Sequence, residues 1–251
     1  MFTPFYKAVQ QHLLAHPPQP VSAPALPGGT RLVAPEAPSW AAGLAEHNTP
    51  GEEAALSRFH EFLDGLADGH SYDNNDLSPG ATSGLSAHLR FGELSPGYVW
   101  AETVAFAEAH PAAAPHAWAF LRQLVWREFA WHRLYHLPDL AVRNVRSQFD
   151  RFEWAWSSHA APWDHALAFA DPAMEPDVDA AQHLGQLAQW QRGDTGVPLV
   201  DAGMRELWET GRMHSRVRMV AGSWLTKNLG IHWRHGEEWF WDTLVLSLIH
   251  I

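Results

Sequence analysis

The chain has 251 residues, a formal net charge of −11 at pH 7, 46% hydrophobic residues and no cysteine. Disulfide bonds and thiolate chemistry are therefore excluded, and together with the lack of a signal peptide this favours a cytoplasmic protein. The acidic balance argues against non-specific nucleic-acid binding as a bulk property, and no apolar run is long enough to cross a membrane.

Charge is distributed unevenly along the chain. Residues 36–76 contain nine acidic residues and one basic residue, Arg58, whereas residues 122–151 contain six arginines and three acidic residues. We therefore expect anion sites in the second half of the chain and an acidic, solvated face in the first half.

The predicted elements are all helical, because no segment shows a useful β-alternation. Residues 1–38, rich in Pro, Ala and Gly from position 17 onward, are expected to form an N-terminal linker or strap, and residues 39–245 a helical domain. In chain order, we expect helices starting near Glu52, paired around His88–His110, and spanning Ala117–His136, Ala181–Gln191, Asp201–Thr210 and Met213–Leu229.

Proline and short polar residues mark several helix ends. Ser95 followed by Pro96 is typical of an N-cap and the first helical position, and Pro115 and Pro138 are expected to bound the long helix between them. Asp201 is interpreted as a helix cap, a structural role, in preference to a catalytic one.

The long helix is expected to carry a polar face beside an apolar one. Gln123, Trp126 and Arg127, with Ala130, fall at helical spacing, and the apolar side consists of Leu121, Leu124 and Val125. An amide, an indole and a guanidinium on one face suit a ligand. A half-buried tryptophan beside a solvated arginine fits the same spacing.

The segment from Trp190 to Met219 combines tryptophan, arginine and a Thr-Gly-x-Pro turn, which suits either a planar ligand carrying phosphates or a nucleic acid. In its last helix, Ser215, Arg216 and Met219 share one face and Arg218 points elsewhere, with Ala221 and Leu225. One arginine could serve a ligand and the other a partner, or both could be ordinary surface residues.

Two further patterns bear on ligands. The loop of residues 82–86 offers hydroxyls and a flexible backbone, as a phosphate cradle or as plain turn material. His132 and His136 have metal-ligand spacing on a helix, but no carboxylate or cysteine cluster completes a site, and we expect no metal.

Longer motifs then make the chain recognisable. They are Thr82-Ser-x-Leu-Ser86, Leu89-x-Phe-Gly-Glu-Leu-Ser-Pro96, Trp126-Arg-Glu-Phe129, Trp190-Gln-x-Gly-x-Thr-Gly-x-Pro-Leu-Val-Asp-Ala-Gly-Met-Arg205, Met213-His-x-Arg-Val-Arg-Met219 and Ile231-x-Trp-Arg-x-Gly-Glu237. In content and order they resemble the flavin-binding half of the DNA photolyase/cryptochrome family, on the side of the cyclobutane pyrimidine dimer photolyases.

The resemblance implies an all-α, multi-helical domain that holds FAD. It also implies a lyase activity, in which photoexcited reduced FAD donates an electron to a pyrimidine dimer flipped out of damaged DNA. We expect a monomer without a membrane segment. We also expect that the domain is truncated at its C-terminus, because residues 246–251 match nothing in the family, and that the N-terminal antenna domain is missing.

The resemblance also assigns residues. Those expected to bind FAD are Tyr72, Thr82, Ser83, Gly84, Leu85, Ser86, Arg218 and Asn228, with Asn228 as the partner of Arg218. Those expected to contact the flipped nucleotide or its phosphates are Gln123, Trp126, Arg127, Ser215, Arg216 and Met219. Trp233 and Trp154 are expected to be the middle and outer members of a tryptophan relay to the flavin, with Trp156 a rival for the outer position, and Gln123 is counted as catalytic.

The sequence departs from the family pattern at several of these positions. Gly84 stands where an arginine is usual, Gln123 where an acidic residue is usual, and Arg212 and Ser215 where tryptophan and asparagine are usual. Two alternatives to a repair enzyme stay open: a cryptochrome-type blue-light photoreceptor, which Gln123 favours, and an inert domain unable to retain FAD, which the expected C-terminal truncation favours.

Overall fold

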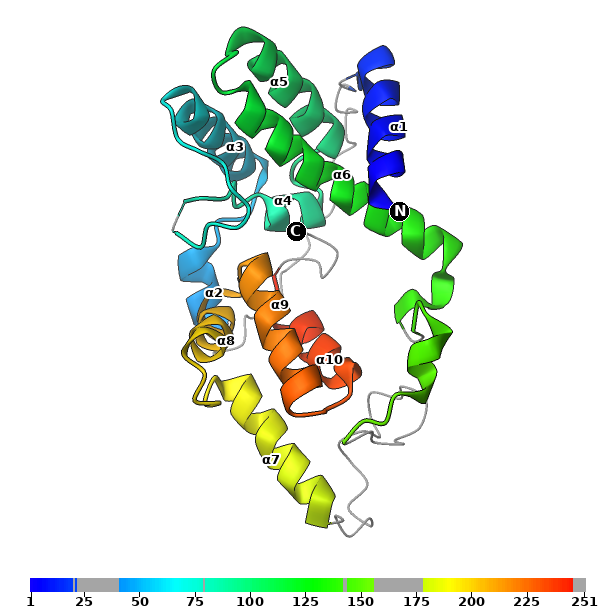
Figure 1. Cartoon of the computed structure of the whole chain (residues 1–251). Helices are drawn as coiled ribbons and strands as arrows, with labels where there is room; N and C mark the ends of the chain where they lie inside the picture. Colours follow the sequence, from blue (N-terminus) through cyan, green and yellow to red (C-terminus); the bar gives the residue numbers. More distant parts are fainter. Residues whose placement is uncertain (20, 22–40, 79, 142–143, 156–177, 246–251) are drawn as a thin grey trace, which may run out of the picture. The chain divides into compact units, whose positions relative to one another are not determined.

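A computed structural model describes residues 1–19, 21, 41–78, 80–141, 144–155 and 178–245 (Figure 1). Within these ranges the elements are helices and there is no β-strand, which confirms the predicted all-α class. The chain divides into two compact units, unit 1 from Met1 to Asp139 and unit 2 beginning at Leu140.

The helices of unit 1 are α1 (Phe2–Ala15), α2 (Ala42–His47), α3 (Glu52–Ala67), α4 (Ser86–Phe91), α5 (Pro96–Ala109) and α6 (Ala114–His136). Two short 3₁₀ segments, η2 (Pro138–Ala141) and η3 (Ser147–Arg151), follow α6. The helices of unit 2 are α7 (Val178–Arg192), α8 (Pro198–Thr210), α9 (Ser215–Ser223), the π-helical turn η4 (Trp224–Asn228) and α10 (Trp233–Thr243).

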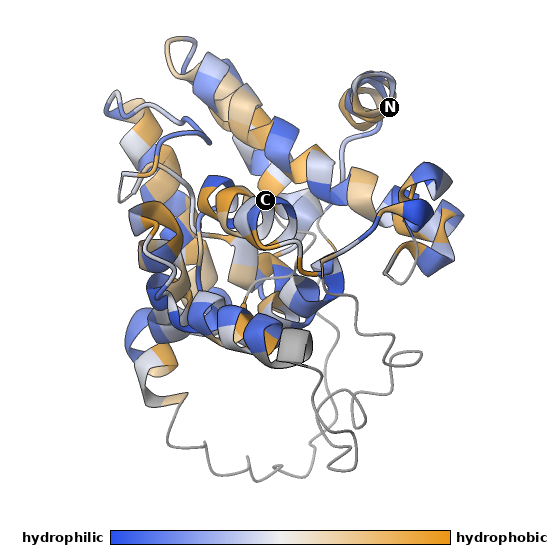
Figure 2. Ribbon diagram, turned by 60° about the horizontal axis from the view of Figure 1, so that its bottom comes forward, coloured by the Kyte–Doolittle hydropathy of each residue, from blue (hydrophilic) through white to orange (hydrophobic). Residues whose placement is uncertain are grey.

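The long helix α6 organises unit 1. Helix α5 packs along it, and the N-terminal end of α1 lies against it (Figure 1). Leu121, Leu124 and Val125 are buried, as their spacing predicts. Each such side chain contributes about 1.5–3 kcal/mol when removed from water. Figure 2 shows that most helices carry both hydrophobic and hydrophilic residues along their length.

Several helix boundaries differ from the expectation. Helix α1 forms inside the segment expected as a strap, because its aromatic residues pack on α6: Phe2 is buried, and the Phe5 ring lies 5.2 Å from that of Phe129. Helix α6 begins at Ala114, so Pro115 lies inside its first turn and does not precede it. Proline fits there because the first turn of a helix needs no N–H donor. Ser95 is the N-cap residue of α5 as predicted, although its side chain makes no capping hydrogen bond.

Asp201 is structural, but it is not the N-cap residue. Helix α8 begins at Pro198, with Val197 as its N-cap, and Asp201 lies in the first turn. Its Oδ1 accepts hydrogen bonds from the Thr195 N–H (2.8 Å) and hydroxyl (2.6 Å), and its Oδ2 accepts one from the Gly196 N–H (3.0 Å). Burial alone would raise the pKa of Asp201. These hydrogen bonds and the charge of Arg205 lower it below its ordinary value.

In unit 2, helices α8 and α9 approach closely at a glycine. A Cβ added to Gly203 would lie 2.2 Å from Cγ1 of Val217. Nearby, Trp190 is fully buried and its indole N–H donates to the carbonyl of Ala221 at 3.0 Å. Because Gly203 has no side chain, α9 can pack closely against α8 and α7. The Ala221 carbonyl on α9 then lies within hydrogen-bond distance of the Trp190 indole.

We predict that Gly203→Ala lowers the free energy of unfolding by about 1–3 kcal/mol, because overpacking outweighs the gain in helix propensity. Gly185→Ala is the matched control, since Gly185 lies in α7 with nothing within 4 Å of an added Cβ. The control should be stabilised by up to about 1 kcal/mol. Urea unfolding of both variants checks this, and a stabilised Gly203→Ala variant would contradict the packing argument.

Candidate functional site

The loop before α4 has one buried anchor and an open polar edge. Leu85 is 1% exposed and belongs to the core of unit 1, whereas Thr82 is exposed and Ser83 and Ser86 are half-buried. Gly84 has φ +67°, a left-handed conformation that favours glycine. The loop thus presents hydroxyls on a fixed backbone, which is the arrangement expected of a phosphate cradle.

Tyr72 lies in the core of unit 1. Its ring packs edge-on against Phe62 and Phe120, with centroids 5.8 Å away in both cases, and burial raises its pKa. The backbone N–H of Tyr72 donates to Nδ1 of His116 at 3.2 Å. These contacts hold the segment before the loop in place.

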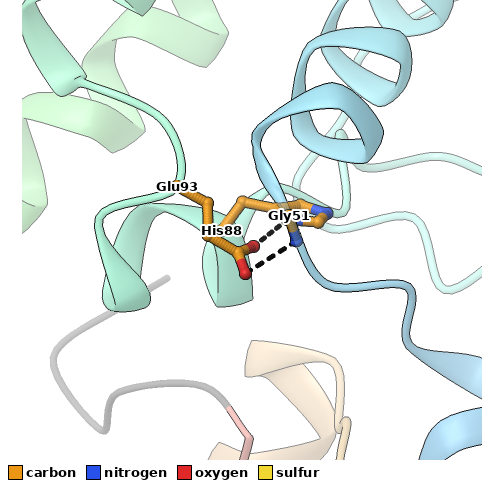
Figure 3. A network of polar contacts seen from close by, with 3 residues as sticks. All are labelled: Gly51, His88 and Glu93. Atoms are coloured by element: carbon orange, nitrogen blue, oxygen red, sulfur yellow. Dashed lines mark hydrogen bonds and ion pairs between the residues drawn. The ribbon is translucent and has the colours of Figure 1, made fainter. Parts of the chain in front are cut away.

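A three-residue network ties the end of α4 to the start of α3 (Figure 3). Oε2 of Glu93 lies 2.6 Å from Nδ1 of His88, and Oε1 of Glu93 accepts the backbone N–H of Gly51 at 2.8 Å. The hydrogen bond to His88 is the main cause that lowers the pKa of Glu93. Burial opposes it, while the N–H of Gly51 and the charge of His88 also lower it. The network fixes α4, and with it the loop, relative to α3.

Sequence reasoning missed the role of Glu93, although the motif that contains it was recognised. The available signal was Gly92, which ends α4 with φ 72° and lets the chain reverse. The reversal is what allows the acid that follows to reach back to His88.

The predicted polar face of α6 exists. Gln123, Trp126 and Arg127 are all half-buried on it. One face of the Trp126 ring is covered by Phe2, with centroids 3.5 Å apart and an interplanar angle of 6°. Arg127 pairs with Glu128 and its side chain is 17% exposed, so the alternative of a solvated arginine is wrong.

Helix α9 separates its two arginines, as its spacing predicts. Arg216 and Met219 are exposed, and Nη1 of Arg216 lies 3.6 Å from the Met219 sulfur. Ser215, at the start of the helix, is half-buried. Arg218 points inward and donates from Nη2 to the carbonyl of Met213 at 3.0 Å. Burial lowers the pKa of Arg218 to about 10, so it remains a cation at neutral pH.

Asn228 does not pair with Arg218 as expected, because the hydrogen bond of Arg218 goes to Met213. The predicted helix Met213–Leu229 is not continuous: α9 ends at Ser223, and the chain continues as the π-helical turn η4. A π turn holds more residues than an α turn, so it rotates the following residues out of register with α9. Asn228, the last residue of η4, is exposed.

Trp154 and Trp233 both contact one imidazole ring. The His232 ring centroid is 4.9 Å from that of Trp154 and 5.4 Å from that of Trp233. Burial, and then the charge of Arg234, lower the pKa of His232, which keeps the bridging ring neutral. The structure therefore brings the two predicted relay residues together through a residue that was not predicted. Trp156 lies outside the described residues.

Several buried donors in the described part of the chain have no acceptor. In unit 2 these include Nε of Arg218 and Nε1 of Trp233, and in unit 1 Nε of Arg127. Such groups fit a ligand rich in hydrogen-bond acceptors, and FAD supplies phosphate oxygens, carbonyls and ring nitrogens. Among the predicted FAD-binding residues, Arg218 has such a donor, and it therefore fits the cofactor that the resemblance implies. Across the described ranges, no cluster of three or more His, Asp or Glu could hold a metal, and no helix is long and apolar enough to span a membrane.

We predict that Glu93→Gln lowers the free energy of unfolding by about 1–3 kcal/mol at pH 7, because a charged hydrogen-bond acceptor is lost. The pKa of Glu93 is depressed in the folded state, so its contribution is present above the unfolded value of about 4.3 and disappears as the pH falls through the folded value. The difference in the free energy of unfolding between wild type and variant should therefore become smaller below about pH 4. Urea unfolding across this range would contradict the assignment if the difference stayed constant.

Comparisons with known proteins give the family of this chain. Residues 120–247 match the model of the FAD-binding domain of DNA photolyase. The deoxyribodipyrimidine photo-lyase of Agrobacterium fabrum is 37% identical over 98% of this chain and 47% of its own length. A class III photolyase structure from Agrobacterium tumefaciens superimposes with a TM-score of 0.71 at 36% identity, and a Synechocystis cryptochrome with 0.68 at 25%. Each superposition covers 98% of this chain. It covers 47% of the photolyase chain and 48% of the cryptochrome chain.

The chain thus spans about half the length of these relatives. The family model covers half of the chain, from Phe120 within α6 through the helices of unit 2 that carry the arginines and tryptophans described above. The chain belongs to the DNA photolyase/cryptochrome family and contains its FAD-binding domain.

Proposed function

We propose that this chain binds FAD and serves the light-dependent splitting of cyclobutane pyrimidine dimers in damaged DNA, the reaction of a deoxyribodipyrimidine photo-lyase. The observation that carries the proposal is that the two arginines of α9 lie in different surroundings. Arg218 is half-buried and its Nε is a buried donor without an acceptor, while Arg216 and Met219 are exposed on the other face. One face suits a cofactor held inside the protein and the other suits a ligand that arrives from solvent.

On the cofactor side, FAD would supply, when reduced and excited by light, the electron that opens the cyclobutane ring. Arg218 would donate hydrogen bonds to its acceptor groups from a half-buried side chain whose Nε is buried. The loop of residues 82–86, with Gly84 and Leu85 shaping its backbone, would hold the phosphates and ribityl chain. Tyr72 and Asn228 are assigned to the same ligand through the family resemblance.

On the DNA side, Trp126 would stack on the dimer through the part of its ring that Phe2 leaves open. Gln123 would hydrogen-bond the bases as donor and acceptor, but an amide cannot deliver a proton as a carboxyl does. Arg127, Arg216 and Ser215 are assigned to the nucleotide or its phosphates, and Met219 to packing beside the bases. An electron entering from solvent would pass through Trp154 and Trp233, both of which contact the His232 ring.

Gln123 and the similarity to a Synechocystis cryptochrome favour the second candidate, a blue-light photoreceptor that binds flavin without repairing DNA. The discriminating experiment has two stages. Flavin absorbance of the purified chain comes first, and loss of thymine dimers from an oligonucleotide under blue light follows. Flavin without dimer loss would favour the photoreceptor, and a colourless chain the inert domain.

The cysteine-free composition supports a cytoplasmic protein, and we propose that it acts as a monomer. Sedimentation of the chain with and without dimer-containing DNA measures the oligomeric state.

We predict that Arg218→Ala raises the Kd for FAD by about tenfold or more, because a hydrogen bond to a charged donor is lost. Arg216→Ala is the matched control on the same helix, and it should retain FAD while binding DNA more weakly. Fluorescence titration with FAD measures both, and equal FAD affinities in the two variants would overturn the assignment of Arg218.

We predict that Trp126→Ala weakens binding of dimer-containing DNA by about 1–3 kcal/mol, which is the usual contribution of one stacked base. Trp131→Ala is the control, because Trp131 lies on the same helix and is 46% exposed. Binding is measured with a fluorescent oligonucleotide. Equal affinities of the Trp126 variant and wild type would rule out the stacking role.

A further inference from the structure

Arg58 belongs to α3, yet its guanidinium lies on the loop of residues 82–86. Its Nε donates to the carbonyl of Ser83 at 3.3 Å. A Cβ added to Gly84 would lie 2.6 Å from Nη2 of Arg58 and 3.1 Å from its Cζ. The guanidinium therefore occupies the space that a side chain at position 84 would need.

The charge of Arg58 is not neutralised by the acidic residues around it. In the described part of the chain its one hydrogen bond goes to the Ser83 carbonyl, and it forms no ion pair. The carboxylate one turn further along α3, that of Glu61, accepts from the Ser57 hydroxyl at 3.2 Å. An arginine side chain has five N–H donors, so four remain for another acceptor.

The loop and the arginine are matched to each other. Gly84 adopts φ +67°, which a residue with a Cβ rarely adopts, and its missing side chain leaves room for Arg58. The hydroxyls of Thr82 and Ser86 make no hydrogen bond within the described ranges. The loop therefore offers hydroxyls beside one unpaired guanidinium, a donor set that suits a phosphate group.

We infer that Arg58 is a further FAD-binding residue, whose guanidinium contacts the phosphates held by the loop of residues 82–86. The inference rests on the proposed function of this chain as an FAD-binding domain. In this chain the positive charge at the loop comes from α3, whereas the family pattern carries an arginine in the loop itself, at the position of Gly84. The expectation that anion sites lie in the second half of the chain is then incomplete, because the single base of residues 36–76 serves one.

The first test is a fluorescence titration of the flavin-free chain with FAD, using wild type, Arg58→Gln and Arg58→Lys. Arg133→Gln is the control, because Arg133 lies on α6 in the same unit and its loss changes the net charge equally. We expect Arg58→Gln to raise the Kd by about tenfold, Arg58→Lys to raise it less, and the control to match wild type within about twofold. Thermal unfolding of Arg58→Gln should match wild type, since the side chain is exposed.

The second test moves the charge from the helix to the loop. Arg58→Ala/Gly84→Arg and Arg58→Ala/Gly84→Ala both carry a Cβ at the strained position, so the guanidinium is the group that distinguishes them. The first should bind FAD more tightly than the second, by about threefold or more. Equal affinities of the two double variants would contradict a role for a guanidinium at this loop.

The outcomes separate the proposed function from the role of Arg58. A wild-type chain that binds no FAD overturns both. Equal FAD affinities of the wild-type chain and the Arg58→Gln variant overturn the role of Arg58 and leave the proposed function standing.

Discussion

In the part of the chain that the structure describes, Arg58 and Arg218 are anchored by backbone carbonyls and not by carboxylates, and this leaves their charge open to a ligand. Arg58 donates to the carbonyl of Ser83 and Arg218 to that of Met213. By contrast, Arg127 and Arg234 are paired with the nearby acids Glu128 and Glu237. A carbonyl fixes the direction of a guanidinium without cancelling its charge, whereas a carboxylate does both.

This distinction matters because the chain is acidic as a whole. With a net charge of −11, the average field of the protein repels an anionic cofactor. Screening limits that field to about 10 Å at 0.1 M salt, so contacts at hydrogen-bond distance decide the outcome. Binding of FAD then depends on a small number of individually placed cations, together with the hydroxyls of the loop before α4.

Features that follow from helical periodicity could be predicted from the sequence. Contacts between residues far apart in the chain could not. The opposite directions of Arg216 and Arg218 and the buried side of α6 follow from spacing alone. The covering of Trp126 by Phe2 does not, because it joins residues far apart in the chain. The same holds for Arg58, which in the sequence is an isolated base in an acidic segment and in the fold lies over Gly84.

Local chemistry explains the remaining differences. The sequence pattern did not separate α9 from the π turn of η4, because η4 starts at Trp224, directly after the last residue of α9. Aspartate is a common N-cap residue, but α8 already begins at Pro198. The carboxylate of Asp201 therefore accepts hydrogen bonds from N–H groups of the preceding turn. The contacts of His232 with two tryptophans could be seen only in the fold, since a histidine in a sequence can have many roles.

The most direct test of this account compares FAD with riboflavin, which has the same ring system and no phosphate. Their dissociation constants for the flavin-free chain are measured by fluorescence as the salt concentration rises. If Arg58 and the loop of residues 82–86 hold the phosphates, FAD binds at least about tenfold more tightly than riboflavin at low salt, and only FAD weakens as salt is added. Equal affinities, or an FAD affinity that salt does not change, would contradict the account.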